Sequence, residues 1–204
     1  AVLIPPFDHP DVIAGQGTCG LEIVEEQPEL DAVIVPVGGG GLLSGITLAL
    51  REKAPSIRII AAEPAGADDA FRSKRDGVRV TSQVPDTIAD GLRTCLGELT
   101  WPVVRDCVER VITVSDDEIR QAMQLLYGRV KLVVEPSAAV AVAGPTQTTS
   151  ARSSARSEPL SSARAARWRA AFALVQMSPT PCGSSSGWIR RAGQAKYSSW
   201  QYGK

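Results

Sequence analysis

Four consecutive glycines constrain the fold of this 204-residue chain more than any other feature of its sequence. They are Gly38, Gly39, Gly40 and Gly41, and we call them the glycine loop. The loop follows residues 32–37, a continuous apolar run of the kind found in strands that are buried on both faces. It precedes residues 42–53, whose apolar positions repeat with the period of a helix. A strand that turns directly into a helix predicts a parallel sheet covered by helices, and therefore an α/β fold.

The same alternation of strands and helices continues along the chain. Residues 57–62 and 108–114 predict two further buried strands. Residues 115–118, with the sequence Ser-Asp-Asp-Glu, have the spacing of a capping box that opens a helix. We also expect a helix over residues 15–27, and another that begins at Pro136, because the first turn of a helix tolerates proline. The elements predict a three-layer αβα arrangement around a parallel sheet.

Residues 145–204 differ from the rest of the chain in charge and composition. They carry nine Lys and Arg against one Asp or Glu, a net charge of +8, whereas residues 1–144 carry 13 against 21, a net charge of −8. Twelve of these 60 residues are Ser, in repeats such as residues 151–157. Such a composition buries too little apolar surface to offset its chain entropy. We predict a partial domain at residues 1–144 and a low-complexity, disordered or out-of-frame tail at residues 145–204. A basic arm for an acidic partner or RNA is the alternative for the tail.

Composition excludes several classes of protein. With 44% hydrophobic residues the chain can bury a core, which excludes wholesale disorder. Zero net charge gives no reason to expect nucleic acid or an anionic membrane as the main partner. No apolar run approaches the roughly 20 residues of a membrane span.

The four cysteines are scattered without CxxC spacing, so we expect a reducing, cytoplasmic location. Residues 1–6 lack a Met and a basic segment, and we expect them to lie inside a longer protein.

The glycine loop is also the strongest indication of a ligand. Consecutive glycines leave the backbone N–H groups free of neighbouring side chains, and the dipole of the following helix favours an anion. The sequence is neither GxGxxG nor GxxxxGK[ST], so the usual dinucleotide and P-loop interpretations are weak. A plain tight turn would need only one or two glycines. The loop therefore predicts a phosphate-binding site.

A second candidate site follows the strand at residues 57–62. Glu63, Asp68 and Asp69 lie on a turn that contains Pro and Gly, and their oxygens could hold a hard cation such as Mg²⁺ or Ca²⁺. The alternative is a helix N-terminus, whose first turn favours acidic residues.

Two other polar residues have less specific surroundings. His9 is the only histidine, and its turn-like segment favours a surface position or the approach to a helix over a general base. Glu135 stands at a junction of strand and helix, where open α/β sheets bind ligands. Simple electrostatics at a helix start would explain Glu135 equally well.

Several segments resemble one family and occur in the family's order. They are Ile-Ala-Gly-Gln-Gly-Thr at residues 13–18, Val-Pro-Val-Gly-Gly-Gly-Gly-Leu at 35–42, Ala-Ala-Glu-Pro at 61–64, Thr-Ile-Ala-Asp-Gly at 87–91, Thr-Trp-Pro at 100–102 and Val-Glu-Pro-Ser at 134–137. Together they resemble the fold-type II pyridoxal-phosphate (PLP) enzymes, and among them the serine racemases and threonine/serine dehydratases. The resemblance covers about residues 1–143. It implies the large-domain half of the tryptophan synthase β-like PLP fold.

The resemblance implies where PLP would bind. The glycine loop, with the amide of Leu42, would cradle the cofactor phosphate, in agreement with the interpretation from the residues alone. Gly91 would lie beside the cofactor ring, where a side chain would intrude, and Glu135 would lie near the pyridine. PLP would act as an electron sink while a proton leaves the amino-acid substrate. The outcome would be racemisation, or loss of water followed by release of ammonia.

The resemblance also implies a metal ion. In serine racemase-like members a divalent cation is held by residues that match Glu63, the carbonyl of Ala67, and Asp69. We therefore expect Mg²⁺, Ca²⁺ or Mn²⁺ at these positions.

Other residues of the family have no match in this sequence. The family's Schiff-base lysine, the serine on the opposite face of the cofactor and a Ser/Asn-Gly loop would lie upstream of residue 15. The lysines present are Lys53, Lys74, Lys131, Lys196 and Lys204. None has a matching context, so we assign no catalytic residue. After Gly144 the family has a helix and a buried strand ending in Ser-Gly-Gly-Asn, where this chain has its Ser/Ala/Arg-rich tail. We hypothesise a frameshift, a misjoined exon or a faulty gene model at that point.

Together these observations predict part of a PLP-dependent serine racemase or L-serine/L-threonine ammonia-lyase (dehydratase). The substrates would be small amino acids, the intact parent would be a homodimer, and the chain alone would be inactive. One alternative is a non-catalytic truncated subunit that binds and modulates an intact homologue. The other is a module that binds a phosphate metabolite.

Overall fold

The computed structural model describes residues 3–153 and, among them, the side chains of residues 3–144. The helices are α1 (Pro10–Glu26), α2 (Gly41–Lys53), α3 (Asp69–Asp76), α4 (Thr100–Cys107), α5 (Asp116–Leu125) and α6 (Pro136–Ser153). The strands are β1 (Ala32–Pro36), β2 (Arg58–Pro64) and β3 (Arg110–Val114). The short elements are the 3-10 turns η1 (Ala65–Ala67) and η2 (Asp90–Leu92), and the π-helical turn η3 (Leu126–Val130). All of them belong to the first of two compact units, Ala1–Leu174, whereas the second, Val175–Lys204, lies outside the described residues.

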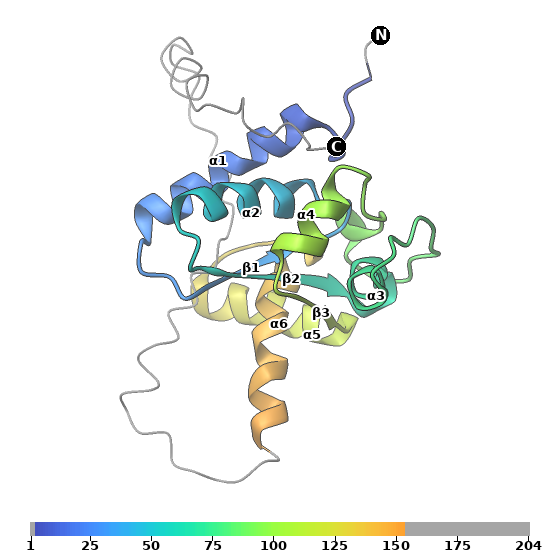
Figure 1. Ribbon diagram of the computed structural model, residues 1–204. Coiled ribbons are helices and arrows are strands. Elements are labelled where there is room, and N and C mark those ends of the chain that lie inside the picture. The colour runs from blue at the N-terminus through green and yellow to red at the C-terminus, as the bar shows by residue number, and fades with distance from the viewer. Residues whose placement is uncertain (1–2, 154–204) are drawn as a thin grey trace. The chain divides into compact units, whose positions relative to one another are not determined.

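The three strands form one parallel sheet in the order β1–β2–β3 (Figure 1). Val33 of β1 pairs with Ile59 of β2, and Glu63 of β2 pairs with Thr113 of β3. Parallel neighbours require a crossover connection, and α2 provides it between β1 and β2. The predicted α/β fold is therefore confirmed. The strand predicted at residues 57–62 is two residues longer at its carboxyl end, because it keeps pairing with β3 to the last residue of that strand.

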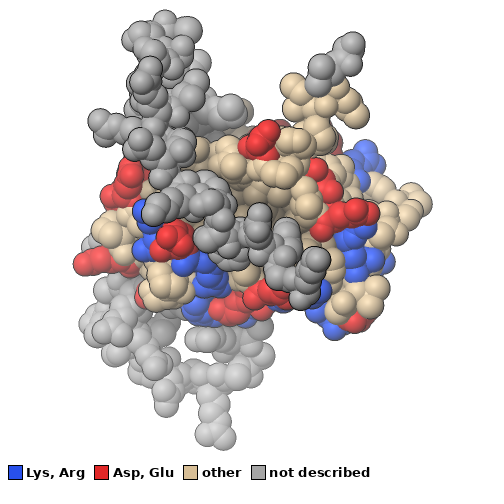
Figure 2. Space-filling view, turned by 45° about the horizontal axis from the view of Figure 1, so that its top comes forward, with Lys and Arg blue, Asp and Glu red and all other residues tan. Residues whose placement is uncertain are grey.

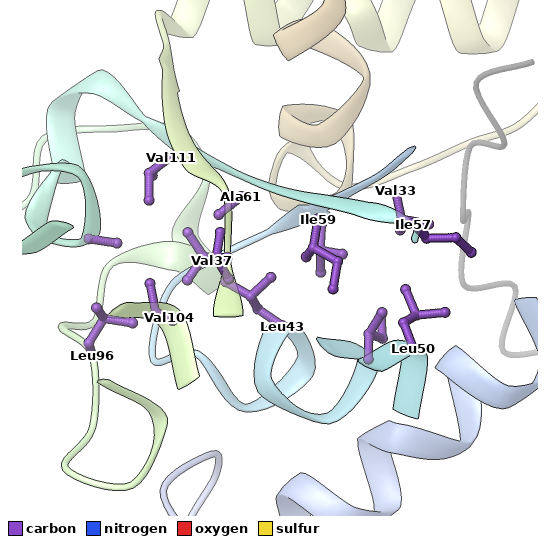
Figure 3. Close-up of a cluster of buried hydrophobic side chains, with 14 of the residues drawn as sticks. Val33, Val37, Leu43, Leu50, Ile57, Ile59, Ala61, Leu96, Val104 and Val111 are labelled. Carbon is purple, nitrogen blue, oxygen red and sulfur yellow. The ribbon is translucent and has the colours of Figure 1, made fainter. Parts of the chain in front are cut away.

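Helices cover both faces of the sheet, which confirms the three predicted layers. Figure 1 shows α1, α2 and α4 on one side and α5 and α6 on the other. Between the sheet and the first group lies a buried cluster drawn in Figure 3, in which Val33 and Ile59 of the sheet face Leu43 and Leu50 of α2 and Val104 of α4. The apolar run that predicted β1 is thus explained by burial.

A second cluster fills the other side of the sheet. Ala62 and Val114 contribute to it from the strands, Ile119 from α5, and Val140 from α6, and all four are essentially inaccessible to solvent. The sheet is therefore buried on both faces, as parallel sheets are in α/β proteins.

The surface carries both signs of charge. Figure 2 shows acidic and basic side chains interspersed on the face that it presents. Ion pairs at the surface include Arg58–Glu109 at 2.6 Å and Arg79–Glu98 at 3.3 Å. Exposed pairs of this kind each contribute little to stability, about 0–1 kcal/mol.

The first helix begins earlier than predicted. The prediction started it at residue 15, but α1 begins at Pro10. His9 is the N-cap residue, with an extended backbone and an Nδ1 that accepts a hydrogen bond from the amide of Asp11 at 3.2 Å. Proline at the first helical position suits this start, because its missing N–H would have no partner there. The histidine cap, outside the usual Ser, Thr, Asp and Asn, is the signal that the prediction missed.

The capping box predicted at residues 115–118 is confirmed at the start of α5. The Ser115 hydroxyl accepts from the amide of Glu118 at 3.3 Å, and the Glu118 carboxylate accepts from the amide of Ser115 at 2.7 Å.

The predicted helix at Pro136 is α6, and the predicted boundary after residue 144 falls inside it. The rest of the predicted tail, from residue 154, lies outside the described residues. Among residues 3–153, no helix combines the length and the apolar character needed to cross a membrane.

The first two helices cross at glycines. A Cβ placed on Gly45 of α2 would lie 2.6 Å from the amide nitrogen of Gly17 in α1 and would also overlap the carbonyl oxygen of Ile13. A Cβ on Gly20 of α1 would lie 2.9 Å from the Cβ of Ala49 in α2. The backbones of α1 and α2 therefore approach as closely as they do because neither carries a side chain at the crossing.

This crossing gives a prediction about stability. Replacing Gly45→Ala should lower the free energy of unfolding by about 1–3 kcal/mol, because the new methyl group collides with backbone atoms that cannot move independently. Gly15→Ala is the matched control, since nothing lies within 4 Å of a Cβ at that position in α1. The control should raise stability by about 0.5–1 kcal/mol, as alanine does inside helices. Urea unfolding of the two variants measures both effects, and equal midpoints would contradict the close crossing.

Candidate functional site

The glycine loop lies at the carboxyl end of β1 and leads directly into α2. All four glycines are buried. Gly40 is the N-cap residue of α2 and has φ of 90°, a conformation that strains any residue with a Cβ. The loop therefore needs glycine at this position for its backbone conformation.

The other glycines are required by packing. A Cβ on Gly39 would overlap the ring of Phe7, and one on Gly41 would lie 2.9 Å from the Cβ of Phe7. A Cβ on Gly38 would lie 3.0 Å from the Cα of Leu92. We predicted that the glycines beyond those needed for a turn reflect a ligand. Close packing against Phe7 and Leu92 already requires these glycines.

The amides of the loop have no partner within the part of the chain that the structure describes. Among residues 3–153, no backbone or side-chain oxygen accepts a hydrogen bond from the amides of Gly38, Gly39, Gly40, Gly41 or Leu42. Buried backbone N–H groups are almost always paired, so a row of unpaired ones is unusual. At a helix N-terminus such a row provides donors and a partial positive charge for an anion. The loop fits a phosphate group on these grounds.

The turn before α4 is attached to the beginning of the chain. The carboxylate of Asp8 accepts hydrogen bonds from the amides of Glu98 and Leu99, both at 2.9 Å, and of Thr100 at 3.3 Å. It thereby caps α4, while the neighbouring Phe7 covers the glycine loop. Neither contact was predicted, because residues far apart in the sequence, some 90 positions for Asp8 and its partners, leave no local pattern.

The predicted cofactor residue Gly91 lies beside the glycine loop. A Cβ on Gly38 would lie 3.4 Å from the carbonyl oxygen of Gly91. The amide of Gly91 donates a hydrogen bond to the hydroxyl of Ser137 at 3.0 Å, and a Cβ on Gly91 would lie 2.9 Å from that hydroxyl. A side chain on Gly91 is therefore excluded, because Ser137 occupies the space next to it. Ser137 was not predicted as a partner of Gly91.

Glu135 lies just before α6 and two residues before Ser137. Its carbonyl accepts the amide of Ala139 at 3.2 Å, and the residue is exposed. Through the bond between Ser137 and Gly91, the start of α6 joins the η2 turn. The structure thus brings three of the predicted segments together, namely the glycine loop, Gly91 and the start of α6.

The predicted metal ligand Glu63 is buried at the carboxyl end of β2, with 1% of its surface exposed. Its carboxylate accepts hydrogen bonds from the amides of Ala70 at 3.1 Å and Phe71 at 2.6 Å, in the first turn of α3. Burial raises the pKa of Glu63 to about 9, against the effect of these amides, and the charge of Asp69 adds to the rise. Glu63 therefore favours its neutral form more strongly than an exposed glutamate does.

Asp69 is equally buried, at 1% exposure, and begins α3. Its carboxylate accepts from the amide of Leu96 at 2.9 Å and from the side chain of Gln83 at 2.8 Å. Burial raises the pKa of Asp69 to about 6. Both carboxylates thus accept hydrogen bonds from backbone amides, in keeping with the alternative that they stabilise a helix N-terminus. Among the described residues, no cluster of three His, Cys, Asp or Glu side chains could hold a metal. Carbonyl oxygens complete such a set in hard-cation sites, and Ala67, the third predicted ligand, is buried in η1 between them in sequence.

The comparison with protein families decides the assignment. The family described as pyridoxal-phosphate dependent enzymes matches residues 1–158. The chain belongs to the pyridoxal-phosphate dependent enzyme family. The resemblance inferred from the sequence segments is therefore confirmed, and so is the parallel αβα fold that it implied.

Individual members of the PLP family agree with this assignment. The chain is 53% identical to a serine racemase of Oryza sativa subsp. indica over 143 residues, which are 70% of this chain and 42% of that protein. It is similar to the structure of maize serine racemase, with 53% identity and a TM-score of 0.69 over 71% of this chain and 44% of that one. It is also similar to the crystal structure of a T.th. threonine deaminase, with 42% identity and a TM-score of 0.68 over 71% of this chain and 55% of that one. The chain thus spans less than half the length of the serine racemases it matches.

The attachment of α4 to Asp8 gives a second prediction. Replacing Asp8→Ala removes the acceptor of three amides at the start of α4 and should cost about 1–2 kcal/mol of stability, as lost helix caps do. Asp11→Ala, at a side chain that is 94% exposed in the first turn of α1, is the control. It should change stability by no more than about 1 kcal/mol. Thermal unfolding of both variants measures the difference, and a control as destabilised as Asp8→Ala would overturn the assignment.

Proposed function

We propose that residues 1–144 are part of the PLP-binding catalytic domain of an enzyme that racemises serine or eliminates ammonia from L-serine or L-threonine. Residues 145–204 would lie outside that domain. The observation that carries the proposal is the row of unpaired amides from Gly38 to Leu42, next to Gly91 and the start of α6. Family membership identifies PLP as the phosphate compound that these amides would bind.

Each residue has a distinct part in holding the cofactor. The glycine loop and the amide of Leu42 would donate hydrogen bonds to the phosphate, and α2 would add its dipole. Gly91 would lie beside the ring, held there by the hydrogen bond from its amide to Ser137. Glu135, exposed before α6, would lie near the pyridine. When bound, PLP supplies an electron sink for the charge left on the substrate when its α-proton is removed.

The described lysines support the expectation that the chain alone is inactive. Lys74 has a pKa lowered by burial, a property of reactive lysines, but its Nζ donates to the carbonyls of Arg105 and Val108, both at 2.6 Å, and of Val104 at 3.2 Å. These carbonyls belong to the end of α4, so Lys74 caps that helix. Lys131 donates to the carbonyl of Gly128 at 2.8 Å. Lys53, the third described lysine, is exposed at the end of α2. We therefore assign no catalytic residue within residues 3–144.

We also propose a divalent cation, Mg²⁺ or the similar Ca²⁺ or Mn²⁺, bound by Glu63, Asp69 and the carbonyl of Ala67. Two carboxyl groups whose pKa values are raised by burial support it, because a cation would offset the cost of burying their charges. Each carboxylate oxygen accepts one hydrogen bond, which leaves a lone pair on each for a metal. The donor set of carboxylates and a carbonyl suits these hard cations.

Titration of the 204-residue chain with PLP tests the cofactor site. We expect saturable binding that inorganic phosphate displaces, and none of pyridoxal, which lacks the phosphate. Borohydride treatment followed by mass spectrometry should leave no PLP mass on any lysine, and serine should not be consumed. The variant Gly40→Ala should lose binding because its φ of 90° disfavours alanine, whereas Gly15→Ala should keep it. Covalent PLP on one lysine with turnover of serine would show that the chain is an enzyme by itself.

Thermal unfolding with and without Mg²⁺ tests the cation site. A cation bound to the folded state should stabilise it by about 2.7 kcal/mol at a hundred times its dissociation constant. Glu63→Gln should abolish this gain, because it removes a ligand charge while keeping the shape of the side chain. Glu52→Gln, at an exposed position of α2, should keep it. An equal stabilisation by Mg²⁺ of the unmodified chain and both variants would rule out this site. No stabilisation of the unmodified chain would also rule it out.

Two further experiments test the alternatives, a module for phosphate metabolites and a non-catalytic subunit. Displacement of PLP by ATP at similar concentrations would favour a module for phosphate metabolites. The second alternative is a non-catalytic truncated subunit that binds and modulates an intact homologue. Co-purification with an intact serine racemase and a changed activity of that enzyme would support it. We place the intact parent in the cytoplasm as a homodimer that acts on serine or threonine.

A further inference from the structure

The segment Thr-Trp-Pro at residues 100–102 contributed to the resemblance but received no role. In the structure Thr100 is the first residue of α4 and has 0% of its surface exposed. Its hydroxyl lies directly beside the glycine loop: a Cβ on Gly40 would lie 2.8 Å from both the Cβ and the Oγ1 of Thr100. Thr100 is therefore placed to influence the backbone of the proposed phosphate site.

The hydroxyl of Thr100 makes two hydrogen bonds that fix its orientation. It donates to the carbonyl oxygen of Gly39 at 2.7 Å and accepts from the amide of Gly97 at 2.9 Å. The amide of Gly97 also donates a hydrogen bond to the Gly39 carbonyl, at 3.3 Å. A hydroxyl has one proton to donate, and that of Thr100 is committed to Gly39.

Fixing the Gly39 carbonyl also fixes the next amide. The peptide bonds of the described residues are all trans, so the C=O of Gly39 and the N–H of Gly40 point in opposite directions from one peptide plane. Because Thr100 holds the carbonyl on its own side, the N–H of Gly40 is directed away from Thr100. That N–H is one of the amides without an acceptor among residues 3–153.

Glycine by itself would not hold this direction. A glycine peptide plane can rotate at little cost, since no Cβ restricts φ and ψ on either side. The plane between Gly39 and Gly40 joins two such residues. A hydrogen bond to the Gly39 carbonyl is therefore needed to select one orientation. The hydroxyl of Thr100 supplies the shorter one, at 2.7 Å, and the amide of Gly97 supplies a second, at 3.3 Å.

Thr100 is in turn held by two carboxylates. Its amide donates to Asp8 at 3.3 Å, and the amide of Leu96, four residues earlier, donates to Asp69 at 2.9 Å. We call residues 96–100 the anchoring turn. It is fixed at one end by the beginning of the chain and at the other by α3, so contacts outside the glycine loop also hold the Thr100 hydroxyl in place.

We propose that Thr100 is a positioning residue, whose hydroxyl holds the Gly39 carbonyl and so aims the amide of Gly40 at the bound phosphate. This inference rests on the proposed phosphate-binding role of the glycine loop. It adds a residue 61 positions away in sequence, which binds no cofactor atom itself and acts through the backbone.

Variants of the 204-residue chain that differ by one hydroxyl test the proposal. Thr100→Ser and Thr100→Ala have side chains of similar size, but only serine keeps the O–H. Thr100→Val keeps the volume and removes the O–H. Thr47→Val is the matched control, because Thr47 is a buried threonine of α2 whose hydroxyl has no partner within the described residues. PLP and inorganic phosphate are titrated at a temperature where each variant is folded, and glycine amide resonances are recorded with ¹⁵N labelling.

We expect Thr100→Ala and Thr100→Val to bind PLP about tenfold more weakly than the unmodified chain, which corresponds to about 1.4 kcal/mol. Thr100→Ser and Thr47→Val should bind with unchanged affinity. The Gly40 amide resonance should move in the two variants without the hydroxyl and stay in place in the other two. A role limited to stability would lower the unfolding midpoint and leave the affinity of the folded chain unchanged. Unchanged affinity and an unmoved Gly40 resonance in folded Thr100→Ala would overturn the proposal.

The resonances also separate this proposal from the proposed function. If the unmodified chain bound neither PLP nor phosphate, the proposed function would fail. The Gly40 resonance in the ligand-free chain would still show whether Thr100 orients the loop, since Thr100→Ser and Thr100→Ala should differ there. Identical spectra of that pair would reject the positioning role. The same pair decides the question if Thr100→Val does not fold.

Discussion

Parallel pairing of the three strands determines where the candidate sites lie. In a parallel sheet all strands end at the same edge, so the residues that follow β1 and β2 are brought together although they are far apart in sequence. The glycine loop follows β1, and Glu63 lies at the end of β2. The glycine loop and Glu63 are both buried, and burial makes unpaired amides and carboxylates costly. Without that register neither site would exist.

Much of the fold was predictable, because its signals are local. The apolar run at residues 32–37, the glycine loop and the capping box at residues 115–118 each specify one element from neighbouring residues. The partners within the site were not predictable. Asp8 binds amides some 90 residues away, and Thr100 binds Gly39 across 61 residues. Such contacts follow from tertiary packing, which has no periodic signature in the sequence. The start of α1 was missed for another reason, since His9 is an uncommon N-cap residue.

The glycine loop shows how one sequence feature can have several causes. We predicted a ligand because a tight turn needs only one or two glycines. In the structure Gly40 is required by its φ of 90°, and Gly39 by the ring of Phe7. Packing therefore explains the absence of side chains, but it does not explain why the amides from Gly38 to Leu42 lack acceptors within residues 3–153. The unpaired amides, more than the number of glycines, are the reason to place a phosphate there.

The two proposed binding sites share the anchoring turn. Asp69 holds the amide of Leu96 at one end, and Thr100 holds the carbonyl of Gly39 at the other. A cation bound by Glu63 and Asp69 would restrain the carboxylate of Asp69, which accepts the amide of Leu96 at 2.9 Å. The turn would then be held more firmly, and with it the direction of the amides in the glycine loop. A cation in this position could therefore favour phosphate binding without touching the cofactor, through backbone hydrogen bonds alone.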